Sequence, residues 1–280
     1  MKKDFDLPSQ LFRWCLVNTS SEHEIFSYET CFPAYLAIAE ADGYLWRSYD
    51  RRLEPLINEV GRGASPRILE VGCGFGHDLI WTAQAGALAV GIDVNSAFVD
   101  IAKRTKVAVE MQIGRSIDVD IRCCNLLAMP EEERFDLIYM KDVFHHLEPR
   151  KEIVAQLGSL LAPGGAIIIV EPNAWNPLIQ LQMFRIRGFR TVVEKTDAST
   201  GERFLFGNER LVTGGRLSHL FSRVGVHGRS KNIRFLPTKL SAQPLMARMA
   251  LGFERMGLEP VFWPACIHTF MSGVKNGNNY

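Results

Sequence analysis

The sequence predicts an α/β fold, built on a doubly wound, mostly parallel sheet of seven strands. Apolar strand-like runs alternate with helical patterns through the middle of the chain, which is typical of parallel strands joined by right-handed crossovers. One run, residues 166–171 (AIIIVE), is apolar enough to be buried on both faces of a sheet. A glycine-rich turn at residues 72–76 (GCGFG) directly follows a strand candidate, as ligand-binding turns do in such folds.

Seven strand candidates account for the sheet, five in the middle of the chain and two near its carboxyl end. They are residues 67–72, 87–93, 118–125, 135–140, 166–171, 226–236 and 266–274. Helical patterns cover residues 78–85 and 95–104, and a further helix has Pro149 in its first turn and ends at the turn 162–165. Asn95 is a suitable N-cap for the second helix, because its side chain can accept hydrogen bonds from the free N–H groups there.

Two segments fall outside this alternation and predict cap elements. Residues 1–60 are rich in aromatic side chains and have helical patterns, whereas residues 173–210 show no strong period. We expect 1–60 to form a helical cap or lid on a core of residues 61–280, with 173–210 as an inserted cap segment. Pockets for small molecules are lined mainly by apolar and aromatic side chains, so both segments are candidates for the substrate pocket.

Composition and charge narrow the classes of partner. Lys and Arg number 32 against 31 for Asp and Glu, a net charge of +1, which predicts no nucleic-acid partner. No run approaches the roughly 18 apolar residues that span a bilayer, and no secretory signal is recognised, so we expect a cytoplasmic protein without an integral membrane segment.

The six cysteines form no C-x-x-C pair, and none has a histidine at ligand spacing, so no metal site is predicted. Arg185, Arg187 and Arg190 indicate a solvated face, with an anionic substrate or membrane surface as the alternative.

The glycine-rich turn predicts a nucleoside ligand. Glycines at 72, 74 and 76 let a ligand approach the backbone closely at the carboxyl edge of the sheet. Asp93 ends the next strand, where such folds place a carboxylate on ribose hydroxyls. The spacing is G-x-G-x-G rather than the G-x-G-x-x-G of pyrophosphate sites, and Glu70 would repel a pyrophosphate but attract an ammonium group. The inferred ligand is therefore S-adenosylmethionine.

Four segments in order, ILEVGCGFG, VGIDVN, FDLIYMKDVFHHLEP and LLAPGGAIIIVEPN, resemble the motifs of class I S-adenosylmethionine-dependent methyltransferases. The resemblance covers residues 65–172 well. It implies the Rossmann-like methyltransferase fold, S-adenosylmethionine as the cofactor, and transfer of its methyl group. The acceptor is expected to be a small molecule, a secondary metabolite or lipid-like compound methylated on oxygen or carbon, because the nucleic-acid and arginine-methylating motifs of the family are missing.

The same resemblance implies the site residues. Glu70 and the backbone of Gly72 and Gly74 would hold the methionine part, and Asp93 would accept from the ribose hydroxyls. Asn125 stands where the family usually carries an acid that accepts from the adenine amino group, and an amide oxygen can also accept this bond. The full cofactor-binding set is Glu70, Gly72, Cys73, Gly74, Gly76, Asp93, Val94, Asn125, Leu126, Lys141 and Asp142.

His145 and His146 follow the fourth strand and are the candidates for a general base. Histidine titrates near neutral pH, which suits proton removal from an acceptor hydroxyl or acidic carbon. The alternative is that these side chains only pack or cap the next helix.

Two other functions stay open at this stage. One is a nicotinamide-dependent oxidoreductase on a similar fold, against which the glycine spacing argues. The other is a methyltransferase-like protein that binds the cofactor but acts as a cyclase or as a non-catalytic partner. A homodimer is a further open alternative.

Overall fold

The computed structural model describes residues 4–19, 21–39, 43–61, 65–196, 201, 203–237, 240–241 and 243–277. Parts of both predicted cap segments, among them 1–3 and 197–200, lie outside the described residues. The chain divides into two compact units, Met1–Cys124 with Leu236–Met256, and Asn125–Phe235 with Gly257–Tyr280.

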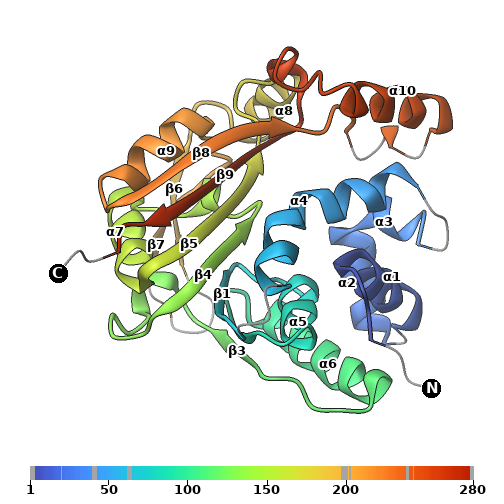
Figure 1. The fold of residues 1–280 in the computed structure, drawn as a ribbon, viewed down its shortest axis with the longest axis vertical. Helices are drawn as coiled ribbons and strands as arrows, with labels where there is room; N and C mark the ends of the chain where they lie inside the picture. Colours follow the sequence, from blue (N-terminus) through green and yellow to red (C-terminus); the bar gives the residue numbers. More distant parts are fainter. Residues whose placement is uncertain are drawn as a thin grey trace. The chain divides into compact units, whose positions relative to one another are not determined.

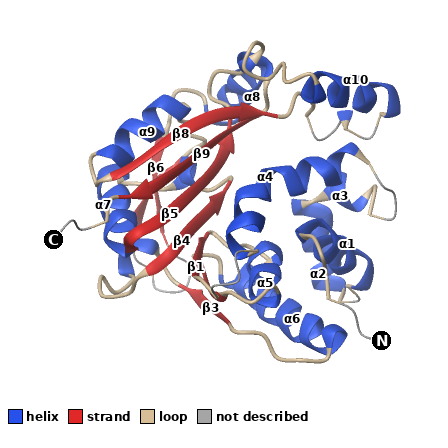
Figure 2. Ribbon diagram, viewed as in Figure 1, coloured by secondary structure: helices blue, strands red, loops and turns tan. Residues whose placement is uncertain are grey.

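Seven strands form one sheet in the order β3-β2-β1-β4-β5-β9-β8. Figure 2 shows the four strands of the second unit, β4, β5, β9 and β8, side by side. In the first unit, β1 (Arg67–Val71), β2 (Leu88–Asp93) and β3 (Val119–Cys123) pair in parallel. In the second unit, β4 (Phe135–Lys141) and β5 (Leu161–Pro172) pair in parallel, whereas β9 (His268–Lys275) is antiparallel to both β5 and β8 (Val226–Ile233). The predicted fold class, a mostly parallel seven-stranded sheet, is confirmed.

Two helices follow the strands of the first unit, α5 (His77–Gln84) and α6 (Ser96–Ile113). The predicted cap is present, because Oδ1 of Asn95 accepts from the N–H groups of Ala97 and Phe98. The sequence placed the end of this helix at residue 104, which is wrong. The helix continues to Ile113 and ends at Gly114, whose φ of 80° suits a glycine C-cap.

The amino-terminal helices of the first unit are α1 (Pro8–Asn18), α2 (Glu22–Cys31), α3 (Pro33–Leu36) and α4 (Tyr44–Val60), and α10 (Pro244–Arg255) also belongs to this unit (Figure 1). One face of α4 is buried, through Leu45, Tyr49, Leu53 and Leu56, which recur at helical spacing. The ring of Phe12 stacks on His77 of α5 with centroids 4.3 Å apart, and the Tyr28 hydroxyl lies 2.7 Å from Nε2 of His77. Much of the aromatic content of these helices therefore packs within the unit.

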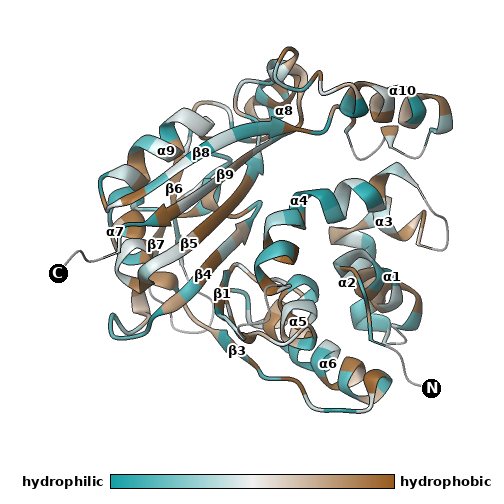
Figure 3. Cartoon of the chain, viewed as in Figure 1, coloured by the Kyte–Doolittle hydropathy of each residue, from teal (hydrophilic) through white to brown (hydrophobic). Residues whose placement is uncertain are grey.

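The second unit holds α7 (Arg150–Leu160) and α9 (Gly214–Ser222), which packs on β8 and β9. Its buried centre consists of β4 and β5, where Figure 3 shows a band of apolar residues. Two predictions need correction here. Pro149 is the N-cap of α7 rather than part of its first turn. The expected turn 162–165 belongs to β5, which begins at Leu161 with a register shift against β4.

The predicted insertion is more ordered than its sequence suggests. It contains the helix α8 (Pro177–Arg187) and a two-stranded antiparallel sheet of β6 (Val192–Thr196) and β7 (Arg203–Gly207). Three short 3-10 helices complete the described elements: η1 (Leu126–Ala128), η2 (Phe144–His146) and η4 (Trp263–Ala265). Among the helices of the described residues, none has the length and apolarity that crossing a membrane requires.

Candidate functional site

The turn between β1 and α5 is built from glycines in left-handed conformations. The φ angles of Gly72, Gly74 and Gly76 are 70°, 52° and 79°. At Gly76, a Cβ atom would lie 3.0 Å from Cβ of Ala102, so packing explains that glycine. At Gly74, a Cβ atom would meet nothing within 4 Å. Gly74 therefore borders open space, as a close approach of a ligand to the backbone requires.

The backbone N–H groups of this turn are used within the chain. Those of Gly72 and Cys73 donate to the carbonyl oxygen of Ile92 at 2.8 and 3.0 Å. That of Gly74 donates to Oδ2 of Asp93 at 2.9 Å, while Oδ1 of Asp93 accepts from the N–H of Asn95, also at 2.9 Å. Both oxygens of the Asp93 carboxylate thus accept from backbone N–H groups and retain acceptor capacity for a ligand.

The turn also has a negative electrostatic character. Burial raises the pKa of the Cys73 thiol, and the charges of Glu70 and Asp93 raise it further. Burial likewise raises the pKa of Asp93, against the opposing effect of its backbone hydrogen bonds. Val94, directly after Asp93, leaves 47% of its surface exposed and offers an apolar patch beside the carboxylate. This combination suits a cationic ligand with an aromatic base better than it suits a pyrophosphate.

The remaining predicted cofactor residues belong to the second unit. Asn125 caps η1, since its Oδ1 accepts from the N–H of Leu127 at 3.0 Å, and Leu126 is buried. Lys141 ends β4 and is partly buried. Asp142 follows it, exposed and with a φ of 57°. Their assignment to the cofactor stays a prediction.

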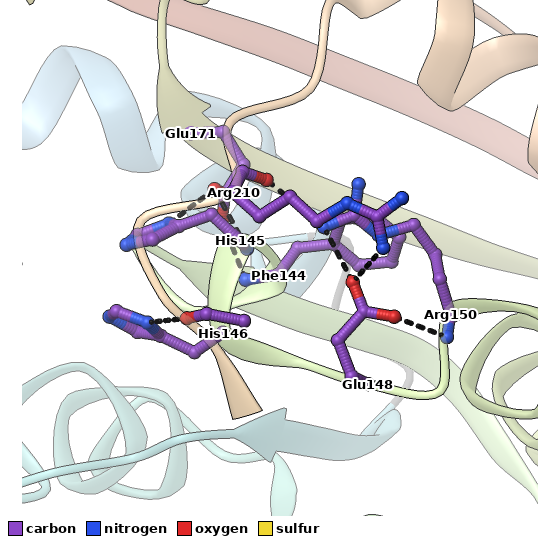
Figure 4. Close-up of polar contacts among 8 residues, drawn as sticks. Phe144, His145, His146, Glu148, Arg150, Glu171 and Arg210 are labelled. Atoms are coloured by element: carbon purple, nitrogen blue, oxygen red, sulfur yellow. Dashed lines mark hydrogen bonds and ion pairs between the residues drawn. The ribbon is translucent and has the colours of Figure 1, made fainter. Parts of the chain in front are cut away.

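The Glu171 carboxylate, at the end of β5, forms hydrogen bonds with His145 and with the backbone just before it (Figure 4). The Glu171 side chain is fully buried and accepts from the backbone N–H groups of Val143, Phe144 and His145. Its Oε2 also lies 2.6 Å from Nδ1 of His145. Glu171 was not among the residues predicted from the sequence, where its only signal is a carboxylate at the end of an apolar strand.

The two histidines respond differently to this environment. Burial lowers the pKa of His145, but the Glu171 carboxylate outweighs burial through its charge and hydrogen bond, so the net shift is upward. Asp142 and Glu209 add to this effect. Burial lowers the pKa of His146, and the neighbouring His145 lowers it further.

His146 and the end of β7 are held together. Nδ1 of His146 lies 2.8 Å from the carbonyl oxygen of Gly207, and the ring stacks on Phe206 with centroids 4.6 Å apart. Beyond β7, Oε2 of Glu209 lies 3.5 Å from Nε2 of His145. Glu209 was not predicted from the sequence, because residues 173–210 have no strong periodic pattern.

A charged network joins the same chain segments. Nη1 of Arg210 donates to Oε1 of Glu148 at 2.6 Å, and Nη2 of Arg150 lies 3.3 Å from that oxygen. Nη2 of Arg150 also donates to the carbonyl oxygen of Arg210 at 3.0 Å (Figure 4). Because Glu148 and Arg150 flank the start of α7, this network holds the segment that carries Glu209 beside the histidines.

Comparison with known proteins identifies the family. A family model described as "Methyltransferase domain" matches residues 45–202, which is more than half of the chain. The chain belongs to the methyltransferase family. The predicted class I recognition, the enzyme class and S-adenosylmethionine as the cofactor of that class are thereby confirmed, and the nicotinamide alternative finds no support.

Curated relatives of this methyltransferase match part of its length. It is 26% identical over 144 residues to the ubiquinone biosynthesis O-methyltransferase of Saccharophagus degradans, covering 51% of this chain and 58% of the relative. It is 26% identical over 130 residues to phosphoethanolamine N-methyltransferase 1 of Triticum aestivum, covering 46% of this chain and 25% of the relative. The matched region thus spans less than two thirds of these relatives.

Solved structures agree in fold. The magnesium protoporphyrin IX methyltransferase of Synechocystis PCC 6803, with bound SAH, superimposes with a TM-score of 0.54 at 14% identity. The match covers 91% of this chain and 100% of that chain. The plantazolicin methyltransferase BpumL in complex with SAH gives a TM-score of 0.51 at 15% identity, covering 97% and 96% of the two chains.

Proposed function

We propose that this methyltransferase moves the methyl group of S-adenosylmethionine to an oxygen or carbon atom of a small molecule, a secondary metabolite or lipid-like compound. The names of its relatives support this class, since they include ubiquinone biosynthesis O-methyltransferases and the methyltransferase GfsG of Streptomyces halstedii. The net charge of +1 argues against nucleic acid as the acceptor. A cytoplasmic location and a homodimer stay predictions.

The residues of the β1–α5 turn fit the cofactor. The observation that carries the proposal is the Asp93 carboxylate, held by Gly74 and Asn95 yet only partly buried. Such a carboxylate can accept from both ribose hydroxyls. The open space at Gly74 leaves room for the ligand, and Val94 offers apolar surface for a base. Glu70 supplies a second acid for the positive end of the methionine part. Gly72, Cys73 and Gly76 shape this turn.

Bound S-adenosylmethionine supplies an electrophilic methyl group on a sulfonium. The chain's own task is then to hold the acceptor in line, to exclude water and to remove a proton where the acceptor carries one. Positioning of this kind can contribute on the order of 7–11 kcal/mol to lowering the barrier.

His145 is the better placed of the two histidines to take a proton from the acceptor. Glu171 fixes Nδ1 and stabilises the imidazolium that forms, so Nε2 is the atom that accepts. His146 is the second candidate, with Nδ1 held by the Gly207 carbonyl.

Two measurements test this function. Calorimetry should detect binding of S-adenosylmethionine to the purified chain, and NADH should give no signal. Labelled S-adenosylmethionine is then offered with a panel of phenols, hydroxylated polyketides and quinol precursors. Transfer of label with release of S-adenosylhomocysteine supports the proposal, whereas cofactor binding without transfer to any acceptor would favour the non-methylating alternative.

A further inference from the structure

We propose that His145, His146 and Glu209 bind a divalent transition-metal ion of the Zn²⁺ type. The sequence predicted no metal site, and the group forms only when the chain brings the end of β7 to η2. One ligand atom from each residue lies within 4.8 Å of the others. This proposal goes beyond methyl transfer, because it concerns ion binding by the second unit alone.

Both imidazoles are oriented as metal-binding histidines are. A metal-binding histidine usually directs its other ring N–H to a carboxylate or carbonyl, which fixes the tautomer and the ring. Here Nδ1 of His145 is held by Glu171 at 2.6 Å, and Nδ1 of His146 by the Gly207 carbonyl at 2.8 Å. Both rings are thereby set with the Nε2 lone pair available, and Figure 4 shows them extending to the same side of η2.

The distances also fit. Ligand atoms bound at about 2.0–2.1 Å to a tetrahedral Zn²⁺ lie about 3.4 Å apart. Nε2 of His145 and Oε2 of Glu209 are already 3.5 Å apart. At the 4.8 Å limit for the whole group, a pair of ligand atoms must approach by at most about 1.4 Å to reach that spacing, which side-chain rotation can supply.

Solvent access and the type of ligand limit which ions this site can bind. The Glu209 side chain is 24% exposed and His146 is only partly buried, so an ion can reach the group from solvent. Two imidazoles and one carboxylate suit Zn²⁺, Co²⁺ or Fe²⁺ rather than Mg²⁺ or Ca²⁺, which prefer oxygen ligands. Three protein ligands leave at least one coordination position open.

The competing explanation is that Glu209 is merely the counter-ion of a protonated His145. The two explanations predict different behaviour toward metal. The metal also competes with the proposed proton acceptor, since Nε2 of His145 has one lone pair. The role of His145 as a base must therefore be measured in the presence of a chelator.

Chelator-stripped full-length protein is titrated with Co²⁺ and Zn²⁺, with no cofactor present. We expect one ion per chain and visible Co²⁺ bands without strong thiolate charge transfer, which separates this site from exposed Cys31 and Cys123. Glu209→Gln and His146→Gln should each weaken binding at least 100-fold. Glu194→Gln on β6 and His219→Gln on α9 each remove a residue of the same type elsewhere in the unit and should bind as wild type does.

Thermal melts check that every variant is folded. If wild type binds neither ion at about 1 mM, roughly a thousandfold above a micromolar Kd, the proposal is overturned. Equal affinity of wild type and Glu209→Gln would do the same. Neither result depends on methyl transfer, so the proposed function can fail or succeed independently.

Discussion

The backbone N–H of Gly74 donates a 2.9 Å hydrogen bond to Oδ2 of Asp93. This bond ties the turn after β1 to the last residue of β2, and it sets the Asp93 carboxylate in one orientation. Gly74 and Asp93, which are separate signals in the sequence, are therefore joined directly in the structure.

Replacement of Asp93 should weaken S-adenosylmethionine binding while the protein stays folded. Each hydrogen bond from a ribose hydroxyl to the carboxylate is worth about 1.5–3 kcal/mol, so Asp93→Ala should raise Kd at least tenfold. Asp100→Ala, an exposed acid on α6, serves as the control. Calorimetry at fixed salt gives both values, and an unchanged Kd for Asp93→Ala would remove this residue from the site.

Two glycine-to-alanine variants separate backbone strain from ligand space. Gly74 and Gly86 both have positive φ, and a Cβ added at either would meet nothing within 4 Å, but only Gly74 belongs to the turn after β1. Both substitutions should cost about 1–2 kcal/mol of stability. Only Gly74→Ala should also weaken S-adenosylmethionine binding. Similar affinity in the two variants would contradict the close-approach argument.

Gly76→Ala should lower stability more than Gly74→Ala does. The added Cβ would lie 3.0 Å from Cβ of Ala102, so helix α6 must shift in addition to the backbone strain. Urea denaturation of both variants measures this difference. Equal stability would mean that the turn relaxes without disturbing α6.

Glu171→Gln should destabilise the second unit. The buried carboxylate accepts from three backbone N–H groups and from His145, and hydrogen bonds to a charged group are worth about 1.5–3 kcal/mol each. We expect a loss of at least about 1.5 kcal/mol in the free energy of unfolding. Glu194→Gln, on the exposed strand β6, should change it by less than about 0.5 kcal/mol. A wild-type melting temperature for Glu171→Gln would show that these hydrogen bonds to Glu171 do not stabilise the unit.

A pair of phenylalanine variants tests whether the amino-terminal helices form a lid. Phe12 is 1% exposed and packs on His77, whereas Phe26 is 67% exposed. Phe12→Ala should cost about 3–5 kcal/mol of stability, and Phe26→Ala should cost little. If instead Phe12→Ala keeps full stability and loses only turnover, residues 1–60 act as a separable lid.

Much of the architecture could be predicted from local sequence. Strands β1, β2 and β4 coincide with predicted runs and β5 contains one, because burial on both faces of a parallel sheet leaves a continuous apolar signal. The Asn95 cap was predictable because capping involves only the next few residues. The glycine turn and Asp93 were recognisable because their chemistry depends on spacing within one strand–helix–strand unit.

Local patterns could not predict contacts between distant segments. Nothing around Glu171 indicates that it accepts from three backbone N–H groups of the β4–η2 connection. Nothing around Glu209 indicates that it lies 3.5 Å from a histidine that follows a different strand. The strands of the seven-stranded sheet, the cofactor turn and the family follow from the amino-acid sequence alone, since these depend on neighbours along the chain, whereas α8, β6 and β7 do not. Which side chains meet at His145 is known only from the folded chain, because that meeting depends on how β5, β7 and η2 pack together.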